Sequence, residues 1–118
     1  MEIFIKGSVP SSKNSKVFTG RFLVWSKAAQ KYRKESRQQY LDNRDLFVSH
    51  IDTYPIKLYI KFVRGTRHKF DYINPCQTLL DLMVEHGWLP DDNSDIVIPI
   101  FEEYSYDKQN PGVCIRME

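Results

Sequence analysis

Carboxylates gather in one stretch of this 118-residue chain, between residues 70 and 98. Asp71 opens the stretch, Asp81 lies in its middle, and the adjacent pair Asp91 and Asp92 comes near its end. Mg²⁺ prefers oxygen ligands, and one or two carboxylates usually suffice because water and substrate phosphate complete its coordination. We expect Asp71 and Asp92 to be the main metal ligands. Asp91 is the second choice, since adjacent residues rarely both face one ion, and Asp81 is either a further acid of the site or a helix-surface carboxylate.

Phosphodiester hydrolysis is the chemistry that such a site would suit. A metal ion can activate water, neutralise the developing charge and hold the phosphate in line for attack. The candidate catalytic residues are therefore the same four acids, Asp71, Asp81, Asp91 and Asp92. The expected cofactor is Mg²⁺, with Mn²⁺ as a possible substitute.

The charge of the chain is strongly asymmetric, although its net charge is only +2. Residues 1–69 carry 15 Lys or Arg against 5 Asp or Glu, a balance of +10. Residues 70–118 carry 2 against 10, a balance of −8, and the two balances sum to +2. Lysines and arginines that hold a phosphate backbone, next to acids that hold a metal, would explain this distribution. Opposite charges that simply pair across the fold are the other explanation.

Candidate phosphate-binding residues lie in two loops and at one helix start. The loop at residues 7–16 is rich in Ser, Pro, Lys and Asn, a composition that a solvated loop would share. A second group of cations directly precedes Asp71, where it could grip the strand to be cut. We expect the DNA-binding residues to be Lys13, Asn14, Lys16, Arg67, Lys69 and Asn74.

The elements that must position the acids begin with a helix from Pro75 to about His86. Asn74 is a good N-cap, and Pro tolerates the first helical position because its missing amide would have no partner there. Gln77 follows three residues later, where it could bond back to the amide of Asn74 as in a capping box. Gly87 is a plausible stop. This helix would carry Asp81 and place the acidic turn just beyond its end.

The remaining pattern predicts an α+β fold in a single domain, residues 1–118, with two principal helices packed on a mixed, mainly antiparallel sheet. A second helix should run from the N-cap Ser26 to about Leu41 or Asn43. The last strand is expected to pair back as a hairpin, and Pro99 marks an edge or an interruption. A further hairpin is expected at 17–25. The predicted strands are 2–6, 56–63, 95–101 and 113–117.

Composition excludes several classes of protein. A hydrophobic fraction of 42% and an aromatic fraction of 14% are those of a globular domain. No apolar run approaches the roughly 20 residues that span a membrane, and Lys6 interrupts the apolar stretch where a signal peptide would lie. Cys76 and Cys114 form no CxxC pair, so we expect reduced thiols, no structural zinc and a cytoplasmic location.

The order of these residues resembles the signature of the RusA-type Holliday-junction resolvases. The matching residues are Asp71, Asn74, Asp81, Gly87-Trp88-Leu89 and Asp91-Asp92. Ser11-Ser12-Lys13-Asn14, after Pro10, also resembles the family's Pro-x-Ser-x-Asn opening. The resemblance implies a RusA-like fold, a homodimer and a bacterial or bacteriophage origin. It also implies magnesium-dependent cleavage of four-way DNA junctions in recombination and repair.

Two positions depart from the family pattern. Ile73 stands where the family has a second Asp, and Gln77 stands where it has a Lys, both at positions thought to be catalytic. Gln77 cannot supply a positive charge, so Arg67 or Lys69 would have to. Three hypotheses follow: a structure-selective DNA endonuclease, a DNA-binding protein of the same fold with weakened or lost cleavage, and an interaction domain whose charged halves pair with each other or with a partner protein.

Overall fold

A five-stranded mixed sheet forms the centre of the computed structural model, which describes residues 1–14, 16–21 and 23–117, with the backbone alone for Asn14 and Leu23. The strand order is β1-β7-β4-β5, and β6 continues beside the end of β4. β7 is antiparallel to both β1 and β4, whereas β5 and β6 run parallel to β4. The strands are β1 (Glu2–Lys6), β4 (Ile56–Arg64), β5 (Val97–Phe101), β6 (Ser105–Tyr106) and β7 (Gly112–Met117).

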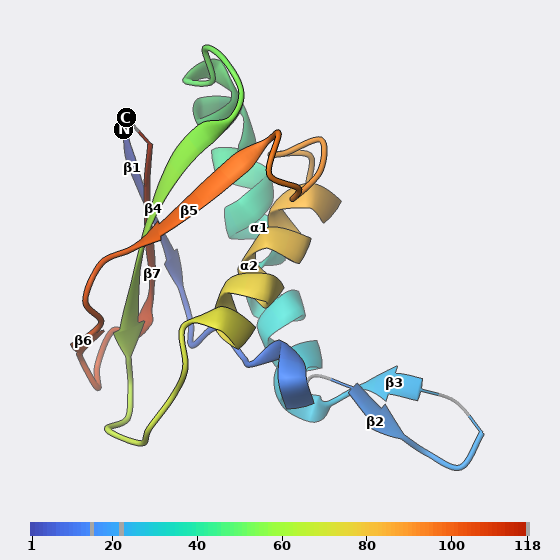
Figure 1. Cartoon of the computed structure of the whole chain (residues 1–118). Coiled ribbons are helices and arrows are strands. Elements are labelled where there is room, and N and C mark those ends of the chain that lie inside the picture. Colours follow the sequence, from blue (N-terminus) through green and yellow to red (C-terminus); the bar gives the residue numbers. More distant parts are fainter. Residues whose placement is uncertain (15, 22, 118) are drawn as a thin grey trace.

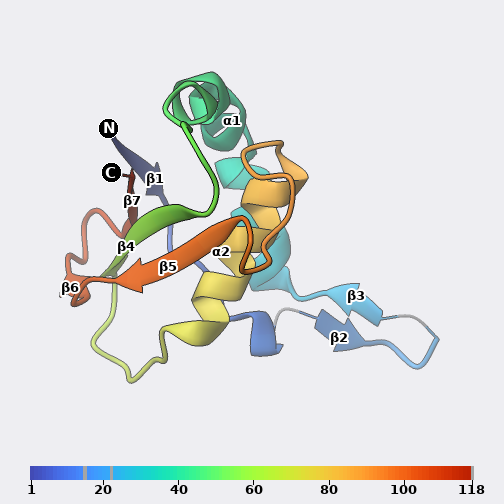
Figure 2. The same ribbon diagram turned by 45° about the horizontal axis from the view of Figure 1, so that its top comes forward.

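Two helices, α1 (Lys27–Ser49) and α2 (Ile73–Glu85), lie on the same side of this sheet (Figures 1 and 2). The predicted α+β class is thereby confirmed. Ser26 caps α1 as expected, because its side chain accepts a hydrogen bond from the Ala29 amide at 3.2 Å. The helix runs beyond the predicted end at 41–43 because Phe47, near its true end, is completely buried. None of the described helices is long and apolar enough to cross a membrane.

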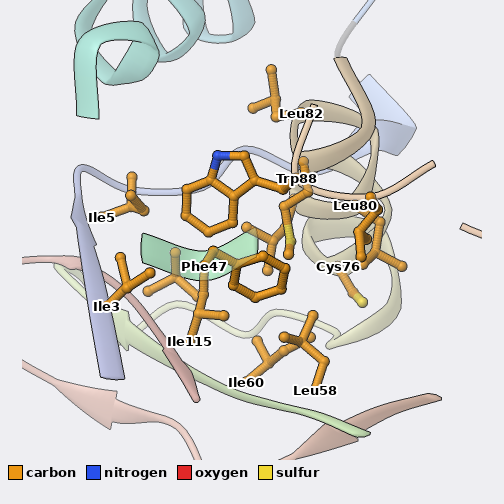
Figure 3. Packing of buried hydrophobic residues seen from close by; sticks show 14 of the residues in the cluster. Ile3, Ile5, Phe47, Leu58, Ile60, Cys76, Leu80, Leu82, Trp88 and Ile115 are labelled. Carbon is orange, nitrogen blue, oxygen red and sulfur yellow. The ribbon is translucent and has the colours of Figure 1, made fainter. Parts of the chain in front are cut away.

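The core lies between the sheet and the two helices (Figure 3). Alternate residues of β4, from Ile56 to Phe62, face it, as the period-two pattern predicts. Trp88, just after α2, is 1% exposed and packs on Phe47 of α1 with 4.8 Å between ring centroids. Its indole N–H also donates to the main-chain carbonyl of Tyr40 at 2.8 Å. The loop after α2 is therefore fastened to α1.

The predicted pairing of the last strand was wrong. β7 lies between β1 and β4 and does not form a hairpin with β5. Val113 and Ile115 of β7 are fully buried, which suits a central strand, whereas Pro99 in β5 has no N–H to donate and suits an edge. The prediction that Pro99 marks an edge strand is confirmed. β6 was not anticipated in the 102–110 connection.

One end of the opposite edge of the sheet is covered by a side chain. Gln39 of α1 accepts a hydrogen bond from the Lys6 amide at 2.7 Å and donates one to the Lys6 carbonyl at 3.1 Å. The amide side chain thus takes the place of a neighbouring strand at the end of β1. Both edges of the sheet are therefore modified, one by Pro99 and one by Gln39.

A small hairpin projects from the body beside the start of α1 (Figures 1 and 2). It consists of β2 (Lys16–Phe18) and β3 (Leu23–Trp25), which pair antiparallel as a separate two-stranded sheet. This confirms the hairpin predicted at 17–25. A short 3-10 helix, η1 (Ser12–Asn14), precedes it and packs against α2.

Truncation of Trp88 to Ala should destabilise the protein by about 3–5 kcal/mol, because it removes a large buried ring and leaves a cavity that the surroundings fill only partly. Urea unfolding followed by circular dichroism measures this loss. Trp25→Ala is the matched control, since Trp25 is 37% exposed. Equal losses for the two variants would show that Trp88 is not a principal core residue.

Candidate functional site

Asp71 holds the beginning of α2. Its Oδ1 accepts hydrogen bonds from the main-chain amide of Asn74 at 2.8 Å and from the Asn74 side-chain amide at 3.1 Å. These two bonds favour the ionised form and lower the pKa of Asp71 from its ordinary value. The expectation that Asn74 caps this helix was wrong: the helix begins at Ile73, two residues before the predicted start at Pro75, and the acceptor is Asp71.

Asn74 also connects α2 to the N-terminal loop. Ser12 donates from Oγ to Oδ1 of Asn74 at 3.2 Å. The Ser-Lys-Asn segment, predicted to contact phosphates, is therefore beside the first turn of α2. The side chain of Asn14 lies outside the described part of the chain.

Gln77 joins two of the predicted acids. Its Nε2 donates to Oδ1 of Asp81 at 2.7 Å and to Oδ2 of Asp92 at 3.2 Å. The capping-box role expected for Gln77 was wrong, because Asp71 already accepts from the Asn74 amide. The amide places Asp81 and Asp92 together, which favours Asp81 as an acid of the site.

Asp92 reaches Gln77 because the loop after α2 turns back along the helix. Gly87 adopts a positive φ of 79°, and the Trp88 amide donates to the Met83 carbonyl at 2.8 Å. This proximity affects Cys76, whose pKa is raised to about 11 by burial and, to a smaller extent, by the negative charge of Asp92. The acidic turn thus lies beside the first half of α2.

Asp71 and Asp92 border one face of this half of the helix. Asp71 is bonded to Asn74 and Asp92 to Gln77, and residues three apart share a helix face with a rise of about 4.5 Å. Within the described residues no three His, Cys, Asp or Glu side chains gather closely enough to hold a metal on their own. The pair Asp81 and Asp92 nevertheless supplies the one or two carboxylates that Mg²⁺ commonly uses.

Asp91 is turned into its own loop. Its Oδ1 accepts from the Asp92 amide at 2.7 Å and its Oδ2 from the Asn93 side chain at 3.1 Å. These bonds lower the pKa of Asp91, with the Asp92 amide as the main cause. Both carboxylate oxygens are engaged, which favours Asp92 over Asp91 as a metal ligand.

A cavity of about 400 Å³ lies on the other side of Asp81, between η1, the hairpin, α1 and α2. Three cations line it, namely Lys13, Lys16 and Arg33. Asp81 is the carboxylate in the lining, and Trp25 supplies an aromatic wall. The predicted residues Lys13 and Lys16 are therefore brought beside one of the predicted acids.

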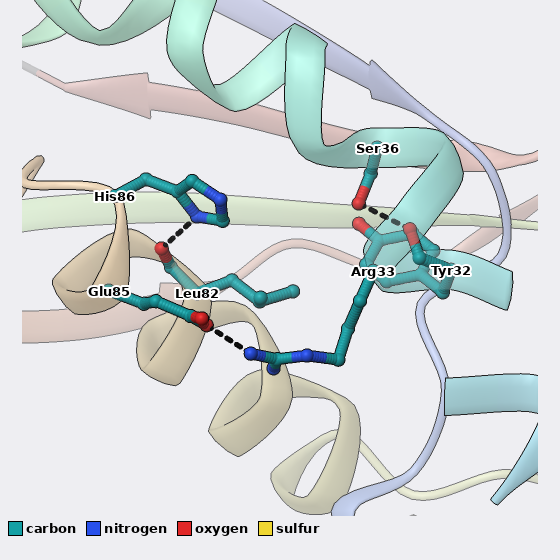
Figure 4. Close-up of polar contacts among 6 residues, drawn as sticks. All are labelled: Tyr32, Arg33, Ser36, Leu82, Glu85 and His86. Carbon is teal, nitrogen blue, oxygen red and sulfur yellow. Dashed lines mark hydrogen bonds and ion pairs between the residues drawn. The ribbon is translucent and has the colours of Figure 1, made fainter. Parts of the chain in front are cut away.

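Arg33 and Trp25 belong to this site although the sequence did not single them out. Arg33 forms an ion pair with Glu85 of α2 (Figure 4), and its guanidinium lies 4.5 Å from the centre of the Trp25 ring. Ala29 and Arg33 lie four residues apart on α1 and so share a helix face, whereas Trp25 lies in β3 before the helix, and no sequence spacing links it to them. In the described part of the chain, Arg33–Glu85 is the one ion pair that joins the basic and acidic halves, so pairing across the fold explains little of the charge asymmetry.

Arg67 and Lys69 are not among the described residues that line the cavity. The guanidinium of Arg67 lies over the Tyr106 ring, 4.0 Å from its centre, next to the end of β4. Lys69 is exposed. Among the described residues neither makes a polar contact with Asp81 or Asp92, so the charge that Gln77 lacks is supplied more directly by the cavity cations.

Asp71→Ala should lower the melting temperature more than Asp71→Asn, because Asn keeps an oxygen that can accept from the Asn74 amide. The pKa of Asp71 is lowered on folding, so its ionised form adds stability above its ordinary value of 3.8, and this is lost as the pH falls through the folded-state value. The difference between wild type and Asp71→Asn should therefore narrow from pH 7 to about pH 3. Thermal unfolding followed by circular dichroism checks this. A difference that stays constant over this range would contradict the role of the carboxylate charge.

Comparison with known proteins adds no family assignment, since neither a protein-family model nor a curated protein matches this chain. The resemblance to RusA-type resolvases therefore remains a prediction from the residues that carry it.

Proposed function

We propose that this protein is a magnesium-dependent endonuclease acting on branched DNA, as its resemblance to the RusA-type resolvases implies. The observation that supports this most directly is the position of Asp81. Its carboxylate lines the basic cavity and is also joined, through Gln77, to Asp92. Acids suited to a metal thus adjoin cations suited to a phosphate backbone.

Each group has a role in this proposal. Asp81 and Asp92 would hold Mg²⁺, with Asp71 bordering the same helix face, and the ion would supply water activation and charge neutralisation. Lys13 and Lys16 would bind the phosphate backbone. Gln77 donates to both carboxylates and so fixes their orientation. A neutral amide adds no charge stabilisation, which is consistent with slow cleavage.

The substrate in this proposal is a four-way junction, and the acting species is a homodimer. A junction offers two equivalent strands, and a two-fold symmetric pair of sites can nick both. Such an activity would serve DNA recombination and repair in a bacterial or bacteriophage setting.

A second candidate is a DNA-binding protein of this fold that no longer cuts. It is favoured by Gln77, whose uncharged amide bonds to both Asp81 and Asp92 where the family has a lysine. It is also favoured by Ile73, whose side chain is 67% exposed beside Asp71 and brings no ligand. Junction binding without nicking would identify this case.

Nicking of a labelled four-way junction should require Mg²⁺ or Mn²⁺ and stop with EDTA. Asp92→Asn should lower the rate by more than about 100-fold, beyond what the loss of a residue that merely supports a metal ligand usually costs. Asp81→Asn, which removes the other proposed ligand, should abolish nicking too, with the fold retained by circular dichroism. Asp52→Asn, at an exposed acid before β4, is the control and should leave the rate unchanged. If both site variants nick the junction at the wild-type rate, the assignment of these acids to the metal site is refuted.

Ile73→Asp should raise the affinity for Mg²⁺ by about tenfold, because it adds a carboxylate at the exposed first residue of α2, next to Asp71. Isothermal titration with Mg²⁺ measures the change. Leu46→Asp adds the same charge at an exposed position of α1 and should have little effect. An equal increase in Mg²⁺ affinity for the two variants would mean that the affinity depends only on the net charge of the protein.

Binding to DNA should weaken steeply between low and moderate salt, because bound phosphates release their counterions. Lys13→Glu with Lys16→Glu should lower the affinity and reduce the salt slope for duplex DNA by about 1.8, which is roughly 0.9 for each phosphate that is no longer neutralised. Lys57→Glu with Lys108→Glu changes the net charge equally, away from the cavity, and is the control. Fluorescence anisotropy over a salt series gives both quantities. A decrease as large in the control as in the cavity variant would show that the cavity is not the binding face.

A further inference from the structure

The basic cavity contains an aromatic surface that phosphate binding alone does not require. Trp25 forms part of its wall and is 37% exposed, and the hydroxyl-bearing residues Ser12 and Thr78 also line it. The position of Trp25 is fixed at the start of α1, because Gln30 donates to its main-chain carbonyl at 2.7 Å. The indole is therefore presented from a defined point of the fold.

Two cations occupy positions over this ring. The ammonium of Lys16 lies 4.8 Å and the guanidinium of Arg33 lies 4.5 Å from the ring centre. Arg33 is fastened from the other side by its ion pair with Glu85, as Figure 4 shows. Lys16 has no further polar contact among the described residues. An incoming planar group can therefore take the place of Lys16 on the ring while Arg33 stays.

The lining combines the groups that bind a nucleotide without reading its sequence. Among the described residues, Lys13, Lys16 and Arg33 line the cavity with Asp81, and Glu85 pairs with Arg33, so an excess of one positive charge remains to attract a phosphate diester. An indole face stacks on any base, because every base has a π surface. A volume of about 400 Å³ lies in the range of small-molecule pockets, which begins near 300 Å³.

We propose that this cavity binds one unpaired nucleotide of single-stranded DNA, with its base stacked on Trp25 and its phosphates held by Lys13, by Arg33 and by the displaced Lys16. Inside a duplex, stacked neighbours cover both faces of each base, so the indole can reach only an unpaired or a terminal base. A branched substrate supplies such a base when a pair at its exchange point opens. This assignment rests on the proposed function only for the origin of the unpaired base, and it can be tested without cleavage.

The test measures binding in EDTA, so that no strand is cut. The probes are hexathymidylate, thymidine monophosphate and a closed circular duplex, which has no terminal bases. Hexathymidylate should quench the fluorescence of Trp25, against a constant signal from Trp88, which is 1% exposed. Trp25→Leu should weaken hexathymidylate binding by between about 5-fold and 150-fold, the reduction expected for one stacked base, and leave duplex binding unchanged. Trp25→Phe should retain most of the affinity but abolish the quenching.

Three outcomes would overturn the assignment: no quenching by hexathymidylate, equal weakening of hexathymidylate and duplex by Trp25→Leu, or thymidine monophosphate binding as tightly as the hexamer. The last would indicate a pocket for a free nucleotide. A parallel junction-nicking assay separates the two proposals. Nicking without quenching refutes the stacking pocket alone, whereas quenching without nicking, with Asp92→Asn leaving the quenching intact, refutes the nuclease alone.

Discussion

The attachment of Trp88 to α1 is the interaction on which the site depends. Its ring is buried against Phe47, and its indole N–H bonds to the Tyr40 carbonyl. This holds the chain that leaves α2 against the longest helix of the fold, so that the following turn comes back along α2. Asp92 meets Gln77 as a consequence of this return. Packing in the core therefore determines which carboxylates become neighbours on the surface.

Most helices and strands could be predicted from the sequence, but the order in which the strands pair in the sheet could not. The alternation of Ile56 to Phe62 identifies β4 because each buried residue is followed by a more exposed one. The place of β7 between β1 and β4 depends on pairing between segments far apart in the chain, which no local pattern specifies. The end of α1 was missed because Phe47 is a single buried residue within a mostly polar stretch.

In the candidate site, too, residue types could be predicted from the sequence, whereas contacts between distant segments could not. Residue types and order gave Asp71 and Asp92 as first choices, Asp91 as the second, and left Asp81 open, whereas the structure links Asp81 with Asp92. The sequence did not reveal that Gln77 bridges two acids, because its position also suits a capping residue. That capping role would need a free Asn74 amide, and in the structure this amide donates to Asp71. Arg33 of α1 and Trp25 of the hairpin meet at the cavity. Predicting this contact would require the angle between α1 and the hairpin, which the sequence does not specify.

The treatment of the sheet edges limits how two copies of this protein can associate. An exposed edge strand is a template for another strand, and natural proteins block such edges to prevent unwanted assembly. Here Gln39 occupies the main-chain groups of Lys6 at one edge, and Pro99 removes a donor from the other. A continuous sheet running through two molecules is therefore disfavoured at both ends. Association through side chains on a face, which leaves each sheet complete, is the arrangement that these edges permit.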